Sequence, residues 1–175
     1  SGCIFSINSN LPIELRFVLA ALIGGTVAAI GGFLISSSIL RLQGDYLAIV
    51  TLAFGEIIRS FIKIIPVTGG TAGLGGIPSL GSKLKTFTFS YVFVILTILV
   101  IRNIVASSHG RAITSIRDNA IAAESIGINI KLYKIKVFTV GAFFAGIAGV
   151  ILGHYINFIE PANFNYNVSI EILVM

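Results

Sequence analysis

Residues 110–129 read GRAITSIRDNAIAAESIGIN and form the one long polar interruption between two apolar runs, Phe87–Ile101 and Val137–Ile159. Hydrophobic residues make up 55% of the chain and charged residues only 11%, against roughly 25% charged residues in an ordinary soluble domain. A soluble chain of this length could not bury so much apolar surface. The sequence therefore predicts a membrane protein with one structured, basic loop on one side of the bilayer.

Four apolar segments are candidate bilayer spans, each of which takes about 20 helical residues. They cover residues 17–40, 46–65, 87–101 and 137–159, and the third is expected to continue past Arg102 to about residue 105. Residues 169–175 are predicted to begin a fifth span, with Ser169 as its N-cap. We expect residues 1–175 to form a single all-α, polytopic transmembrane bundle, and a fragment of a longer polytopic protein.

Basic residues predict the orientation, because they collect in cytoplasmic loops. The loop 102–136 carries six Lys or Arg residues and Arg41 adds a seventh on that side, whereas the opposite side carries three. The connection at about 106–136 is therefore expected to be cytoplasmic, and the glycine-rich loop 66–86 external. The net charge of +5 is interpreted as topological, not as a sign of nucleic-acid binding.

The cytoplasmic loop has a helical apolar pattern. Ile113, Ile116, Ala120 and Ala123 are spaced to share one face of a helix over residues 111–125, and Gly127 is placed to end it. Such a helix can insert its apolar face into a partner or lie as a solvated or interfacial loop. The acidic residues Asp118 and Glu124 disfavour a position on anionic lipid.

The second span contains the pair Glu56 and Arg59. Glu56 lies near the centre of the expected span, where an unpaired charge costs at least about 2.5–3.5 kcal/mol. Arg59 follows three residues later on the same helical face and is predicted to pair with it. The pair can line a translocation pathway or order the bundle, and the sequence leaves both interpretations open.

Small residues mark two of the expected spans and predict close helix packing. They are Gly24, Gly25, Ala28, Ala29, Gly31 and Gly32 in one, and Gly141, Ala142, Ala145, Gly146, Gly149 and Gly153 in the other, with Gly149 and Gly153 in a Gly-x-x-x-Gly arrangement.

The chain shows no pattern typical of a metal site or an enzyme. His109 and His154 have no carboxylate at ligand spacing, and Cys3 is the single cysteine. The glycine-rich loop is not a P-loop, because no Gly-Lys-Ser/Thr ending follows at the required spacing. We therefore expect no metal, no bound cofactor and no catalytic activity in this chain.

Several segments, in consistent order, resemble the permeases of branched-chain amino acid ABC transporters of the LivM type. Residues 40–59, LRLQGDYLAIVTLAFGEIIR, resemble the signature helix of that family. The other matching segments are Thr68-Gly69-Gly70 with Gly73-Leu74 and Gly76-Ile77-Pro78 in the external loop, Gly110-Arg111-Ala112, Ile116-Arg117-Asp118-Asn119, Ala122-Ala123 and Gly127-Ile128-Asn129 in the cytoplasmic loop, and Ile159, Pro161, Phe164 and Ser169-Ile170 before the next span.

The resemblance implies an importer subunit for leucine, isoleucine or valine in the bacterial inner membrane. It implies a second, LivH-type permease, a periplasmic binding protein, and two ATPase subunits that hold ATP and Mg²⁺. It also implies that the cytoplasmic loop couples to the ATPase through Gly110, Arg111, Arg117, Asp118, Asn119, Ala123, Glu124 and Gly127. Two alternatives are a membrane scaffold that recruits a cytoplasmic partner and a secondary transporter or channel.

Overall fold

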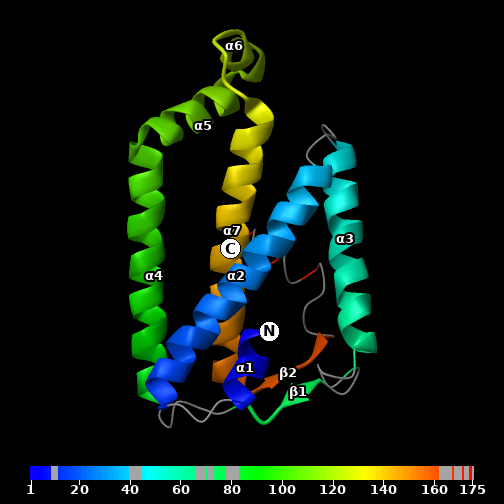
Figure 1. Cartoon of the computed structure of the whole chain (residues 1–175), viewed down its shortest axis with the longest axis vertical. Coiled ribbons are helices and arrows are strands. Elements are labelled where there is room, and N and C mark those ends of the chain that lie inside the picture. The colour runs from blue at the N-terminus through cyan, green and yellow to red at the C-terminus, as the bar shows by residue number, and fades with distance from the viewer. Residues whose placement is uncertain are drawn as a thin grey trace.

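The computed structural model describes residues 1–8, 12–39, 45–65, 70, 73–77, 83–161, 167, 171 and 174. These residues form long helices joined by short ones, together with one pair of two-residue strands (Figure 1). The elements are α1 (Gly2–Asn8), α2 (Ile13–Ile39), α3 (Asp45–Ile64), β1 (Leu74–Gly75), α4 (Lys83–Ala106), α5 (Ser108–Asp118), α6 (Ala120–Ser125), α7 (Ile130–Ile156) and β2 (Phe158–Ile159). The expected helical membrane fold is confirmed.

Three helices in the described part of the chain are long and apolar enough to cross a membrane. They are Glu14–Ile39, Leu84–Ala106 and Ile130–Ile156. The remaining expected span forms as α3 and has 20 residues, but it contains Asp45, Glu56, Arg59 and Lys63. Most of the proposed fifth span, including its N-cap Ser169, lies outside the described residues.

The boundaries of α7 differ from those expected, and its capping residues explain the difference. α7 begins at Ile130, seven residues before the apolar run, because the Asn129 side chain accepts a hydrogen bond from the Leu132 N–H at 3.1 Å. It ends at Ile156, because Asn157 adopts a left-handed conformation with φ 58°. The helix thus ends before Ile159, the expected end of this span. The helix of the third expected span continues past Arg102, since α4 ends at Ala106.

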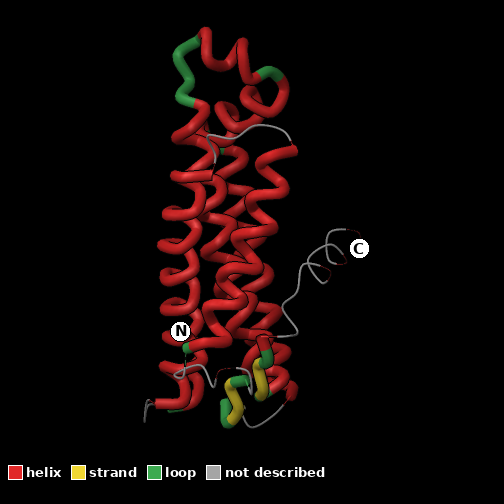
Figure 2. Tube along the Cα trace, turned by 90° about the vertical axis from the view of Figure 1, so that its right-hand side faces the viewer, coloured by secondary structure: helices red, strands yellow, loops and turns green. Residues whose placement is uncertain are grey.

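Two ends of the bundle differ in character. Figure 2 shows the long helices running between them, with α5 and α6 at one end and β1 and β2 at the other. The end of α2 and the start of α3 lie toward the α5–α6 end in Figure 1. The connection between α2 and α3 and the basic loop thus lie toward the same end of the bundle, as the predicted orientation requires.

The core lies where α2 crosses α7. A Cβ placed on Gly146 of α7 would lie 2.5 Å from the Ala28 Cβ and 2.7 Å from the Gly24 carbonyl oxygen, so only glycine fits there. Gly32 of α2 meets α7 in the same way at Ala142. The predicted packing of small residues is thus confirmed within the chain.

Of the Gly-x-x-x-Gly pair, only Gly153 faces another helix in the described structure, and that helix is α1. Gly149 has open space around its Cα, and Gly153 faces the side chains of Ile159 and Cys3. The close approach is displaced by one turn to Gly146, because that face of α7 points at α2.

A buried hydrogen bond between Ser6 and His154 connects α1 to α7. His154 Nδ1 donates to the Val150 carbonyl oxygen at 2.9 Å, which leaves Nε2 to accept from the Ser6 hydroxyl, also at 2.9 Å. The fully buried Phe17 of α2 packs edge-on against the His154 ring, with centroids 5.0 Å apart. One histidine therefore holds α1, α2 and α7 together.

The strands connect the glycine-rich segment to the end of α7. β1 pairs antiparallel with β2, with Leu74 opposite Ile159 and Gly75 opposite Phe158. Gly73 has φ 80°, and a Cβ there would lie 2.6 Å from the Ile159 carbonyl oxygen. The pairing therefore depends on glycine at this position.

We expect Gly146→Ala to destabilise the protein by about 1–3 kcal/mol, because the added methyl group overpacks the α2–α7 crossing. Gly141→Ala is the matched control on α7, since a Cβ at Gly141 meets nothing within 4 Å. Thermal unfolding in detergent measures both. Equal midpoints for the two variants would show that the crossing does not limit stability.

Candidate functional site

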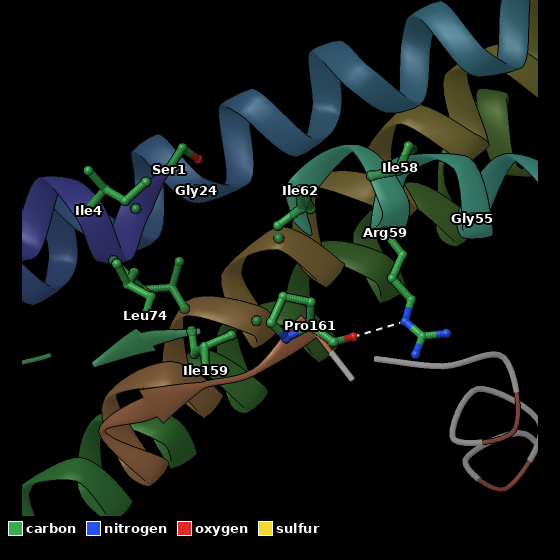
Figure 3. A pocket seen from close by; sticks show the side chains of 15 residues that line it. Ser1, Ile4, Gly24, Gly55, Ile58, Arg59, Ile62, Leu74, Ile159 and Pro161 are labelled. Carbon is green, nitrogen blue, oxygen red and sulfur yellow. Dashed lines mark hydrogen bonds between the residues drawn. The ribbon is translucent and has the colours of Figure 1, made fainter. Parts of the chain in front are cut away.

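A cavity of about 420 Å³ lies between α1, α2, α3, α7 and the strand pair (Figure 3). α3 contributes Gly55, Ile58, Arg59 and Ile62, whose spacing places them on one helical face. The opposite wall comes mostly from glycines and aliphatic residues, which are Gly24, Gly146, Gly149, Val150, Leu74 and Ile159. The cavity is therefore almost entirely apolar, with a cationic side chain at one side.

Arg59 is held by two acceptors. Its Nη1 donates to both carboxylate oxygens of Glu56, at 3.0 and 3.3 Å, and its Nε donates to the Pro161 carbonyl oxygen at 3.0 Å (Figure 3). The side chain of Arg59 is 22% exposed and that of Glu56 is 43% exposed. The predicted pairing of Glu56 and Arg59 is confirmed.

No sequence pattern predicted the contact between Arg59 and Pro161, because the two residues lie 102 positions apart. Through it, α3 is tied to the segment that follows β2. Since α3 packs only lightly against α2, this hydrogen bond is a specific link between α3 and the rest of the described bundle.

The cytoplasmic loop contains two helices where the sequence predicted one. α5 ends at Asp118 and α6 begins at Ala120, because Asn119 is extended (φ −154°, ψ 104°) and caps both. Its side chain accepts a hydrogen bond from the Ala122 N–H at 3.1 Å, and its own N–H donates to the Ser115 carbonyl oxygen. The hydrogen bonds that an asparagine makes as a cap compete with those of a continuous helix, and here the helix breaks at Asn119.

Gly127 ends α6 as predicted. It has φ 90°, its N–H donates to the Glu124 carbonyl oxygen, and the Ile128 N–H donates to the Ala123 carbonyl oxygen. These two bonds form a Schellman motif, which favours glycine at this position.

The eight loop residues assigned by resemblance divide into two groups. The first group shapes the loop and consists of Gly110, Asn119, Ala123 and Gly127. Gly110 and Ala123 are buried, and a side chain on Gly110 would collide with the Val105 carbonyl. Asn119 and Gly127 determine where the helices end. The four charged residues Arg111, Arg117, Asp118 and Glu124 are exposed. Arg117 and Asp118 form an ion pair of 3.0 Å whose side chains remain 76% and 66% exposed.

Part of the apolar face expected for the loop packs against α7. Ile113 and Ile116 are half-buried and line a cavity of about 300 Å³ with Tyr133, Val137 and Phe138 of α7. The exposed aliphatic residues are instead Ile121 and Ile126, at 83% and 78% exposure. The sequence pattern missed them because they fall off the single-helix face.

Two of the three candidate residues of the external loop, Thr68 and Gly69, lie outside the described residues. Gly70 is described, with φ 57°, and a Cβ there would lie 3.2 Å from the Lys63 carbonyl oxygen. Gly70 therefore makes the left-handed turn that follows α3.

Among the described residues, neither His109 nor His154 belongs to a metal-ligand cluster or to an exposed nucleophile–base pair. Within the described ranges, no three His, Cys, Asp or Glu side chains gather where a metal ion could sit. Ser6 and His154 are within hydrogen-bond distance, as a nucleophile and its base would be, but both are buried. His109 lies exposed against the Tyr133 hydroxyl, with His109 Nδ1 3.3 Å from the oxygen.

The sequence matches the family described as the permease component of the branched-chain amino acid transport system, over residues 3–175. It is 33% identical to the high-affinity branched-chain amino acid transport system permease protein LivM of Escherichia coli (strain K12), and equally to that of Salmonella typhimurium (strain LT2). Each match covers 87% of this chain and 43% of the relative.

A probable LivM permease of Methanocaldococcus jannaschii is 26% identical over 85% of this chain and 44% of the relative. The chain thus spans less than half the length of these relatives. No solved structure matches it significantly.

We expect Gly127→Ala to destabilise the end of α6 by about 1–2 kcal/mol, because the left-handed conformation penalises a Cβ. Gly127→Asn is the matched control, since asparagine tolerates this conformation better. Amide hydrogen exchange of residues 120–128 would report faster exchange in the alanine variant alone. The same exchange in both variants would contradict a conformational role for this glycine.

Proposed function

The chain belongs to the family of permease components of branched-chain amino acid transport systems, and from this premise we propose that it is part of the membrane-spanning subunit of an ATP-driven importer. The cargo is leucine, isoleucine or valine, and the membrane is the bacterial inner membrane. The observation that carries the proposal is the family match over residues 3–175, on a chain whose described part combines apolar spanning helices with one structured, basic loop.

In this proposal residues 1–175 are one transmembrane domain, and α3 is a fourth span beside α2, α4 and α7. Two features support α3 in the bilayer: its 20 residues match the hydrocarbon thickness, and Glu56 and Arg59 neutralise each other. A fifth span follows from about residue 169. The loop 102–136 faces the cytoplasm, since it carries six basic residues.

Partner subunits supply the energy. ATP and Mg²⁺ bind to two ATPase subunits, a LivH-type permease completes the pathway, and a periplasmic binding protein delivers the amino acid. The permease itself is not an enzyme and carries no cofactor. Its segment at Thr68–Gly70 belongs to the external loop that faces the binding protein.

The α5–α6 loop is the coupling element in this mechanism. Exposed Ile121 and Ile126, surrounded by exposed charges, provide an apolar contact for the ATPase with a polar rim. Capping side chains at Ser107, Asn119 and Asn129 leave short connections between α4, α5, α6 and α7. A displacement of the loop on closure of the ATPase dimer is therefore transmitted to α4 and α7, which opens the pathway to one side at a time.

The test uses the full-length permease reconstituted with its ATPase subunits, second permease and binding protein. We expect Arg117→Glu/Asp118→Lys to reduce the stimulation of ATP hydrolysis by loaded binding protein about fivefold or more, because it reverses exposed charges on the docking surface. The readout is ATP turnover, with subunit co-purification as a check on assembly.

The matched control reverses the exposed ion pair of Lys85 and Glu14, 3.1 Å apart at the strand end of the bundle. Lys85→Glu/Glu14→Lys should leave the stimulation unchanged. Equal effects of the two reversals, or an assembled complex in which neither has an effect, would refute the coupling role. A protein that never binds an ATPase would instead favour a scaffold or a secondary transporter.

A further inference from the structure

We propose that the cavity beside Arg59 is a binding subsite for the zwitterion of an aliphatic amino acid. Arg59 binds the α-carboxylate, and the Pro161 carbonyl binds the α-ammonium group. Glu56 lies outside the cavity lining and acts through its ion pair with Arg59. The inference rests on the proposed function and adds to it a location and a chemical basis for selecting the substrate.

The lining of the cavity matches such a ligand. Arg59 is the one charged side chain among the described residues that line it, and Pro161 places a carbonyl oxygen 3.0 Å from the Arg59 Nε. The surrounding side chains are mostly branched and aliphatic, as a leucine or valine side chain requires: Ile4, Ile58, Ile62, Val150 and Ile159. The volume of about 420 Å³ falls in the usual range for small-molecule sites, roughly 300–1,000 Å³.

The ion pair makes the subsite selective for a zwitterion. Glu56 and Arg59 neutralise each other, and an α-amino acid also carries two adjacent, opposite charges. When the zwitterion enters, its carboxylate replaces Glu56 as an acceptor of the guanidinium. Its ammonium then lies beside the Pro161 carbonyl and near the Glu56 carboxylate, which is 3.0 Å from Arg59 Nη1 before the ligand binds. No charge is then left unpaired in apolar surroundings. A ligand with only one of the two groups would leave Glu56 or Arg59 without a partner.

The subsite also links occupancy to the position of α3. Arg59 joins α3 to the segment after β2 through Pro161, and α3 otherwise packs only lightly on α2. A ligand carboxylate that competes for the Arg59 guanidinium therefore weakens the hydrogen bond from Arg59 to Pro161, which holds α3 in place at this side of the cavity.

The experiment measures binding of labelled leucine to the purified full-length transporter complex without the delivery protein. The competitors are 4-methylpentanoate, which is leucine without its amine, and 3-methylbutylamine, which is leucine without its carboxylate. We expect both to compete poorly in the wild type. Arg59→Gln should weaken leucine binding at least about tenfold and improve relative binding of the amine, whereas Glu56→Gln should improve relative binding of the acid.

Lys63→Gln is the matched control, because Lys63 is a cation on α3 outside the lining of the cavity. It should bind leucine as the wild type does. Gly149→Leu provides a variant that leaves the ion pair intact: a Cβ there meets nothing within 4 Å, so the added side chain extends into the cavity. It should weaken leucine binding while subunit co-purification persists.

The subsite is refuted if the Glu56 and Arg59 variants assemble and change binding of leucine and both analogues equally or not at all. That result would leave the pair with a structural role and the proposed function intact. The proposed function fails separately if the complete wild-type complex takes up no leucine with ATP and loaded binding protein.

Discussion

The close approach of α2 and α7 at Gly146 is the contact on which the rest of the structure depends. It brings α7 against α2 so closely that the short helix α1 can pack on both, where His154 binds Ser6 and contacts Phe17 edge-on. The end of α7 then places β2 beside β1. These elements line the Arg59 cavity together with α3, so its shape depends on a helix crossing that only glycine permits.

The second constraint is electrostatic. A cation and a carboxylate in an apolar helix are tolerated only when they are paired, and Arg59 uses Glu56 and the Pro161 carbonyl for this purpose. The same contacts place the guanidinium at the side of the cavity. At the opposite end of the bundle, the α5–α6 loop leaves Ile121, Ile126 and four charged residues exposed, which fits contact with a partner.

Local patterns allowed much of this to be predicted. The lengths of the apolar runs predicted the long helices, the spacing of Glu56 and Arg59 predicted their pairing, and Gly127 predicted the end of α6. The break at Asn119 was missed, because an asparagine within a helical pattern can either continue a helix or cap one. The contacts of Arg59 with Pro161 and of Ser6 with His154 join residues more than a hundred positions apart, and no local pattern encodes them.

The central claim is that this chain belongs to a permease driven by ATP from the side of the α5–α6 loop. The most direct test is uptake of labelled leucine into proteoliposomes that contain the full-length permease with its partners, with ATP supplied on the loop side only and no ion gradient. The account predicts uptake that requires hydrolysable ATP on that side and loaded binding protein on the other. Uptake driven by an ion gradient without ATP would contradict it.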